Sequence, residues 1–187
     1  MSITVSVSHT TGVDHHDHVG LLREAVVDGG MHWADLGSGQ GAFTLALADL
    51  LGSTGSIHVV DRDRRALGMA VRNLHERFPT VRVTPLVADF TTPLGLPPLD
   101  GIVMANSIHF VRNKRSVLGL VRANLRPGGR LVLVEYDTDQ GNPWVPYPLS
   151  FGTWATLVGE AGFHDTRRLG AVPSRFLGSI YSAVSTS

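Results

Sequence analysis

Short apolar runs alternate along this chain with longer segments in which apolar residues recur every three or four positions. The runs are typical of buried β-strands, and the longer segments are typical of helices with one apolar face. Elements that alternate in this way form a parallel sheet covered on both faces. Strands are predicted at residues 31–36, 56–60, 81–87, 99–105 and 130–136. Helices are predicted from residue 14 to a glycine stop at 29–30, across 45–51, and at 64–77, 114–125 and 151–161.

The end of the chain departs from this alternation. Two strand patterns, near residues 163–169 and 176–184, are separated by only a few residues and predict an antiparallel pair. Residues 1–13 are polar and alternating, and we expect them to be loose. Because no internal repeat or linker interrupts the pattern, residues 1–187 are expected to form a single domain.

A glycine-rich loop, Asp35-Leu36-Gly37-Ser38-Gly39-Gln40-Gly41, joins the first predicted strand to the next helix. Glycine permits positive φ and carries no Cβ, so such a loop lets the backbone approach a ligand closely. The helix that follows directs its free N–H groups at that ligand. Gly37, Gly39 and Ala42 match the pattern of dinucleotide-binding folds. Asp35 does not suit a pyrophosphate, which it would repel, but it suits an ammonium group.

Composition narrows the class of protein. With 187 residues, 43% of them apolar, the chain is long enough to bury a core without covalent staples. Sixteen basic residues balance sixteen acidic ones, which argues against nucleic acid as a partner. The chain has no cysteine, which excludes disulfides and thiolate sites and fits a reducing compartment. We find no signal-peptide pattern and no apolar run near the roughly 20 residues of a membrane helix, so a cytoplasmic protein without membrane contact is expected.

Polar side chains end four of the predicted strands: Asp35, Asp61, Asp89 and Asn106. In a parallel sheet these ends meet at one edge, where ligands bind. The order of these residues, with Asp-x-Gly-x-Gly-x-Gly at the first of them, resembles the class I S-adenosylmethionine-dependent methyltransferases over residues 14–184. In detail the chain is most similar to the small-molecule branch of that family, which includes quinone-biosynthesis methyltransferases.

The resemblance implies the fold and the cofactor. The fold would be α/β: a Rossmann-like, doubly wound, mostly parallel seven-stranded sheet with an antiparallel last strand and helices on both faces. The cofactor would be S-adenosyl-L-methionine, whose methyl group is transferred to a small-molecule acceptor. Residues 14–30 would form an N-terminal helix or lid.

The resemblance also implies which residues hold the cofactor. Asp61 would accept both ribose hydroxyls, because a carboxylate has two oxygens. Asp89 would receive the adenine amino group, and Asn106 would face the methionine part. Each has a structural alternative, such as capping a loop or a helix. The predicted set is Asp35, Gly37, Ser38, Gly39, Gly41, Asp61, Arg62, Asp89, Phe90, Asn106 and Ser107.

Two residues near the expected acceptor position are candidates for catalysis. His109 lies three residues after Asn106, and an imidazole with a pKa of about 6.5 can take a proton from a nucleophile. It could equally form part of the pocket wall. Glu135 and Asp137 end the fifth strand and point to the same side of an extended chain, so either could contact the acceptor or act as a base. We predict His109 and Glu135 as candidate catalytic residues.

No metal site is predicted, because the acid that metal-dependent O-methyltransferases carry after strand four is missing. His15, His16 and His18 crowd the first helix, but adjacent helical residues diverge, so only His15 and His18 share a face. A solvated helix start or a lid contact to substrate would explain them.

The predicted function is methyl transfer from S-adenosylmethionine, and two alternatives stay open. One is a partner subunit that holds the cofactor without turnover. The other is an NAD(P)-dependent oxidoreductase, which Gly37, Gly39 and Ala42 also fit. The acceptor and the methylated atom are open, although the residues at 106–110 differ from the Asn/Asp-Pro-Pro-Tyr of enzymes that methylate nucleic-acid bases. A homodimer whose second chain completes the pocket is open too.

Overall fold

The computed structural model describes residues 14–26, 31–174 and 176–187. The predicted loose segment at 1–13 and the predicted glycine stop at 29–30 lie outside the described residues. The helices are α1 (His15–Val26), α2 (Ala42–Leu51), α3 (Arg64–Arg77), α4 (Lys114–Asn124) and α5 (Phe151–Glu160), with short 3₁₀ helices η1 (Gly52–Thr54) and η2 (Ile108–Phe110). The strands are β1 (His32–Leu36), β2 (Ser56–Asp61), β3 (Arg82–Val87), β4 (Leu99–Ala105), β5 (Leu125–Tyr136), β6 (His164–Ser174) and β7 (Gly178–Thr186).

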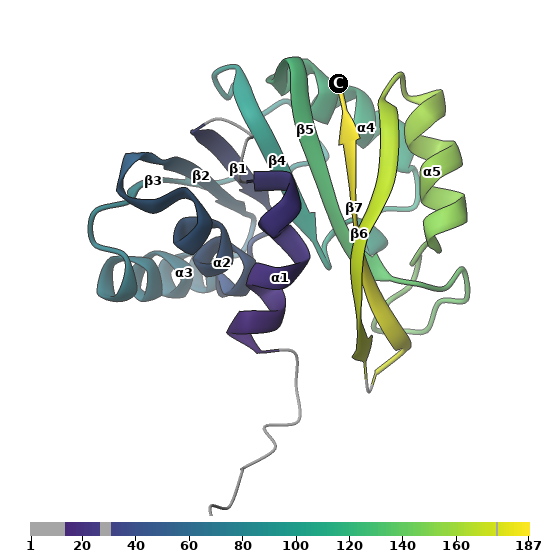
Figure 1. The fold of residues 1–187 in the computed structure, drawn as a ribbon, viewed down its shortest axis with the longest axis horizontal. Helices are drawn as coiled ribbons and strands as arrows, with labels where there is room; N and C mark the ends of the chain where they lie inside the picture. The colour runs from purple at the N-terminus through teal and green to yellow at the C-terminus, as the bar shows by residue number, and fades with distance from the viewer. Residues whose placement is uncertain (1–13, 27–30, 175) are drawn as a thin grey trace, which may run out of the picture.

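The strands form one seven-stranded sheet in the order β3-β2-β1-β4-β5-β7-β6 (Figure 1). Strands β1 to β5 pair in parallel, whereas β7 runs antiparallel to both of its neighbours, β5 and β6. The predicted Rossmann-like, doubly wound fold is confirmed. The strand order reverses between β1 and β4, so the carboxyl ends of these two strands flank the crevice in which such sheets bind ligands.

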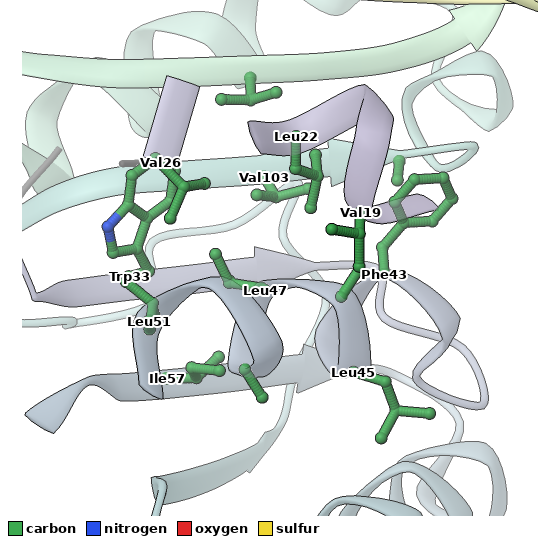
Figure 2. Close-up of a cluster of buried hydrophobic side chains, with 14 of the residues drawn as sticks. Val19, Leu22, Val26, Trp33, Phe43, Leu45, Leu47, Leu51, Ile57 and Val103 are labelled. Carbon is green, nitrogen blue, oxygen red and sulfur yellow. The ribbon is translucent and has the colours of Figure 1, made fainter. Parts of the chain in front are cut away.

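Helices cover both faces of the sheet, and each face has its own apolar core (Figure 1). On one face α1, α2 and α3 cover a core that includes Leu22 of α1, Leu47 of α2 and Trp33 of β1, which Figure 2 labels. On the other face α4 and α5 pack on the sheet with Leu131 and Trp154. No helix within the described ranges is long and apolar enough to cross a membrane.

The histidines of α1 attach this helix to α2. His15 Nε2 lies 3.1 Å from a carboxylate oxygen of Asp49, and the ring of His18 lies 4.4 Å from that of Phe43. His16 is exposed. Among residues 14–26, 31–174 and 176–187, no group of three or more histidine and acidic side chains is arranged to hold a metal ion.

Strand β5 begins earlier than the sequence pattern predicts. The predicted helix ends at residue 125 and the predicted strand begins at residue 130, but the structure includes residues 126–129 in β5. Leu125 pairs with Leu99 and Arg130 pairs with Gly101, so the residues between bulge out of the ladder. The proline and glycines of this segment therefore shape a bulge within the strand, and α4 ends one residue earlier than predicted.

The last two strands form the predicted antiparallel pair, with shifted limits. Strand β6 extends to Ser174, and pairing continues to the contact between Ser174 and Gly178. The prediction placed this strand near residues 163–169. Backbone pairing with β7 does not depend on apolar alternation, and it carries the strand further.

A glycine in the central strand β4 is required by packing. A Cβ at Gly101 would meet ring atoms of Trp33 far closer than real Cβ atoms approach, and Trp33 is fully buried. We expect Gly101→Ala to lower the free energy of unfolding by about 1–3 kcal/mol through overpacking. Gly119→Ala is the matched control. Nothing lies within 4 Å of a Cβ at this exposed position of α4, and alanine has a higher helix propensity than glycine. Urea denaturation of both variants measures the difference; equal stabilities would contradict this account.

Candidate cofactor site

A pocket of about 500 Å³ opens at the carboxyl ends of β1, β2, β3 and β4, where the strand order reverses. Its volume lies in the range of small-molecule sites, and its position is the one at which doubly wound sheets bind ligands. The segment after each of these strands forms part of the wall. The lining residues are Gly37, Gly39, Asp61, Arg62, Ala88, Asp89, Phe90, Thr91, Asn106, Ser107, Phe110, Val111 and Arg112.

The three glycines of the loop after β1 all take left-handed backbone, with φ of +78° at Gly37, +53° at Gly39 and +91° at Gly41. A Cβ at Gly37 would lie 2.6 Å from the Cβ of Ser107, and one at Gly41 would lie 2.8 Å from that of Ala70. At Gly39 nothing lies within 4 Å. Gly37 and Gly41 therefore let the loop pack on the end of β4 and on α3, whereas Gly39 leaves open space at the pocket.

The carboxylate of Asp61, at the end of β2, contacts the glycine loop directly. Its Oδ2 accepts the N–H of Gly39 at 2.7 Å, and its Oδ1 accepts the N–H of Asp63 at 2.8 Å. Each oxygen keeps a further lone pair. The helix cap of α3 is Asp63, since its carboxylate accepts from the N–H groups of Arg65 and Ala66. Asp61 is thus free of the capping role and lines the pocket.

Asp89, after β3, forms a tight turn with Thr91. Its Oδ1 accepts the backbone N–H of Thr91 at 2.9 Å and the hydroxyl of Thr91 at 2.7 Å. These hydrogen bonds lower the pKa of Asp89 below its ordinary value, so the carboxylate is ionised at neutral pH. The next residue, Phe90, directs its ring at the glycine loop: its Cε1 would lie 3.1 Å from a Cβ at Gly37.

Asn106, after β4, is a non-glycine residue in left-handed backbone, with φ of +49°. Its N–H donates to the carbonyl of Val134 at 2.9 Å. Its side-chain Oδ1 is buried and has no hydrogen-bond partner among the residues that the structure describes, and the same holds for Oγ of Ser38. An unpaired buried polar atom costs about 1–3 kcal/mol, and strained residues cluster at ligand sites. A polar ligand would satisfy such atoms.

Asp35, in contrast, does not line the pocket. Its side chain is 1% exposed, and it accepts a hydrogen bond of 2.5 Å from the hydroxyl of Thr44 on α2. Burial raises the pKa of Asp35 to about 7, although the Thr44 hydrogen bond opposes this shift. Ser38 and Gly41 also lie outside the lining residues. The structure therefore divides the predicted cofactor set into residues that line the pocket and these three.

The structure brings His109 and Glu135 together, but neither lines the pocket. His109 Nδ1 lies 3.0 and 2.9 Å from the two carboxylate oxygens of Glu135, and both side chains are buried. The pair joins η2 to β5. Asp137, the other acid at this strand end, is turned to a different partner and pairs with Arg168 at 2.5 Å.

The amino-acid sequence identifies the family of this chain. The sequence profile of the methyltransferase domain family matches residues 27–160. The chain belongs to this family. A curated relative, the carboxy-S-adenosyl-L-methionine synthase of Chromohalobacter salexigens, is 32% identical over 133 residues, which are 68% of this chain and 49% of that protein. This methyltransferase domain therefore spans about half the length of the curated relative that it matches.

Solved methyltransferases have the same fold. An S-adenosylmethionine-dependent methyltransferase from Aquifex aeolicus superposes with a TM-score of 0.70 at 20% identity, covering 91% of this chain and 89% of that one. The magnesium protoporphyrin IX methyltransferase of Synechocystis, solved with bound S-adenosylmethionine, has a TM-score of 0.70 at 19% identity, with coverage of 91% and 78%. These structures confirm the class I fold. The family match and the curated relative support S-adenosylmethionine as the cofactor.

The pocket of the methyltransferase domain suits this cofactor by its own geometry. Gly39 leaves open space for close approach, and the carboxylate of Asp61 has lone pairs to spare for a diol. The unpartnered Oδ1 of Asn106 is an acceptor for an ammonium group. The residues present therefore fit a ligand that carries both groups.

Sequence reasoning missed the lining residues Ala88, Thr91, Phe110, Val111 and Arg112. Ala88 and Thr91 flank the predicted Asp89 and Phe90, so a wider window around each strand end would have included them. Phe110 offered a signal of its own, since it is a large aromatic residue only four positions after the predicted Asn106. Only the turn of η2 decides that it faces the pocket while His109 does not.

Proposed function

We propose that this domain transfers the methyl group of S-adenosylmethionine to a small-molecule acceptor. The observation that carries the proposal is the pocket at the reversal of strand order, where Asp61, Asp89 and Asn106 meet from three strand ends. When bound, S-adenosylmethionine supplies a methyl group on a sulfonium: the methyl carbon is the electrophile, and the sulfur leaves as a neutral thioether. The protein then has to orient donor and acceptor and keep water out.

Each side chain of the pocket suits one part of the cofactor. Asp61 would accept the two ribose hydroxyls, and Asp89 would accept the adenine amino group beside Phe90. The amide oxygen of Asn106 would accept from the ammonium group of the methionine part, which would satisfy an atom that is otherwise unpaired. Gly37, Gly39, Arg62 and Ser107 would complete the wall, and Asp35, Ser38 and Gly41 would hold the glycine loop behind it.

His109 and Glu135 stay predictions as catalytic residues. Their burial and their mutual hydrogen bonds support a positioning role, because they fasten the η2 segment that carries Phe110 into the pocket. An acidic acceptor that ionises by itself would require no base, so methyl transfer does not depend on either residue acting as one.

The acceptor, the partners and the location are proposals for the whole protein. The balance of sixteen basic and sixteen acidic residues supports a small molecule over a nucleic acid, and cytoplasmic location and a homodimer stay predictions. The alternative of an NAD(P)-dependent oxidoreductase loses support, because the reversed β7 differs from the parallel order of dinucleotide folds. An assay of methyl consumption distinguishes an active methyltransferase from a cofactor-binding subunit without turnover.

Calorimetric titration with S-adenosylhomocysteine and, separately, with NADH tests the proposal. We expect S-adenosylhomocysteine to bind and Asp61→Ala to weaken it by at least roughly tenfold, because the variant loses the charged acceptor for the ribose. Asp63→Ala is the matched control: it removes the α3 cap, at a cost of about 1 kcal/mol in stability, but leaves the pocket carboxylate.

The outcomes separate the functions. NADH binding in place of S-adenosylhomocysteine binding would overturn the methyltransferase proposal. Equal loss of affinity in Asp61→Ala and Asp63→Ala would show that Asp61 acts only on the turn before α3. Binding of S-adenosylhomocysteine without methyl consumption across a broad panel of acceptors would favour the non-catalytic subunit.

A further inference from the structure

A row of aromatic rings extends from the pocket wall across the neighbouring surface. Phe110 lines the pocket although it is 57% exposed, and its ring lies 4.3 Å from that of His109. His109 lies 6.0 Å from Tyr136, which lies 5.9 Å from Phe176, and Phe176 lies 6.3 Å from Trp144. Trp144 and Phe176 are 71% and 49% exposed. His109 is only 3% exposed, so the row passes beneath the surface there, and Phe110 is the exposed ring that borders the pocket. An exposed aromatic ring in a pocket wall is typical of a small-molecule site.

The segments that carry this row are tied to one another. The N–H of Tyr147 donates to the carbonyl of His109 at 3.0 Å. Lys114 Nζ donates to the carbonyl oxygens of Val111 and Tyr147, at 2.9 and 2.7 Å. These bonds fasten the loop after β5 to η2, and the His109–Glu135 contact fastens η2 to β5. The pocket wall that Phe110 forms is therefore preformed, which lowers the entropy cost of binding a rigid ligand.

Arg112 supplies a positive charge at the same wall. It is exposed and lines the pocket two residues after Phe110, and it makes no hydrogen bond or ion pair with any residue in the described part of the chain. Arg62, the other arginine of the pocket lining, lies close enough to Asp89 to lower the pKa of that carboxyl, so its charge is partly balanced there. A guanidinium presents a planar set of donors that matches a carboxylate. An unpaired arginine in a pocket wall is therefore a site for an anionic group.

We propose that the methyl acceptor is a flat aromatic molecule that bears a carboxylate, with its ring on Phe110 and its carboxylate on Arg112. This proposal rests on the proposed function, since it concerns the acceptor end of the same pocket. Asp61 and Asp89 repel an anion from the rest of the wall, which directs the carboxylate to Arg112. A neutral ligand over this wall would partly desolvate the guanidinium without pairing it, which disfavours neutral acceptors.

The test is calorimetric titration of the 187-residue chain, saturated with S-adenosylhomocysteine, with naphthoate and with its neutral counterpart naphthamide. We expect naphthoate to bind roughly tenfold more tightly than naphthamide. Arg112→Gln is expected to abolish this difference, and Phe110→Ala to weaken both probes by about threefold to tenfold. Arg72→Gln, which removes an exposed arginine of α3 outside the pocket lining, is the matched control and should change neither affinity.

Titration of every variant with S-adenosylhomocysteine alone separates this proposal from the proposed function. If the unmodified chain does not bind it, the proposed function fails, and the acceptor proposal that rests on it falls as well. If Arg112→Gln weakens S-adenosylhomocysteine as much as naphthoate, Arg112 serves the carboxylate of the cofactor and the acceptor proposal alone is overturned. Equal binding of the two probes, or binding of neither, overturns it too. So does a dimer in sedimentation velocity that Trp144→Ala dissociates, because a second copy would then cover the row.

Discussion

Glu135→Ala is expected to lower the free energy of unfolding by about 3–5 kcal/mol, the usual effect of breaking a buried polar pair. The Glu135 side chain is 0% exposed; it lies 2.9 Å from His109 Nδ1 and accepts the N–H of Tyr136 at 2.8 Å. Its removal leaves both buried donors without this acceptor, and leaves a cavity as well. Urea denaturation followed by circular dichroism measures the change.

Glu135→Gln is the matched control for this prediction. Glutamine keeps the volume and one acceptor oxygen, so we expect a smaller loss, about 1–2 kcal/mol. Combining Glu135→Ala with His109→Ala should cost less than the sum of the single changes, because both remove the same contact. An alanine variant as stable as the unmodified chain would contradict the role of this pair in joining η2 to β5. A glutamine variant that keeps its stability but loses methyl transfer would instead support the predicted catalytic role.

Asp35 is expected to make the stability of this domain fall as the pH rises from about 4 to about 7. Burial raises the pKa of Asp35 to about 7 from an ordinary value of 3.8, so the folded state binds this proton more tightly than the unfolded chain does. Its contribution to stability is complete at low pH and is lost as the pH rises through 7. At about 1.4 kcal/mol per pH unit, the total loss is about 4 kcal/mol.

Asp35→Asn isolates this effect from other titrating groups. Asparagine keeps the size of the side chain and an acceptor for the hydroxyl of Thr44, but it carries no proton to lose. The difference in stability between the variant and the unmodified chain should therefore grow in favour of the variant from about pH 4 to about pH 7, and then level off. Urea denaturation of both proteins across this range measures it. A constant difference would show that Asp35 titrates at its ordinary pKa.

The site residues that were easiest to predict from the sequence are those whose positions follow directly from the fold. Asp61, Asp89 and Asn106 were predicted to meet because each follows a strand of a parallel sheet, and all three line the pocket. The glycines of the first loop were recognisable because left-handed backbone restricts the residue type so strongly. These features depend on the chain within a few residues, which is the range that spacing and residue type describe.

The sequence alone therefore determined the alternation of strands and helices, the reversed last strand and the residues at the strand ends. Only the tertiary structure decided that Asp35 is buried against Thr44, that His109 turns away from the pocket toward Glu135, and that Phe176 lies beside Trp144. The residues of each of these groups lie apart in the chain. Spacing fixes which face of an element a side chain occupies, but burial and the choice of partner depend on which distant element packs against that face.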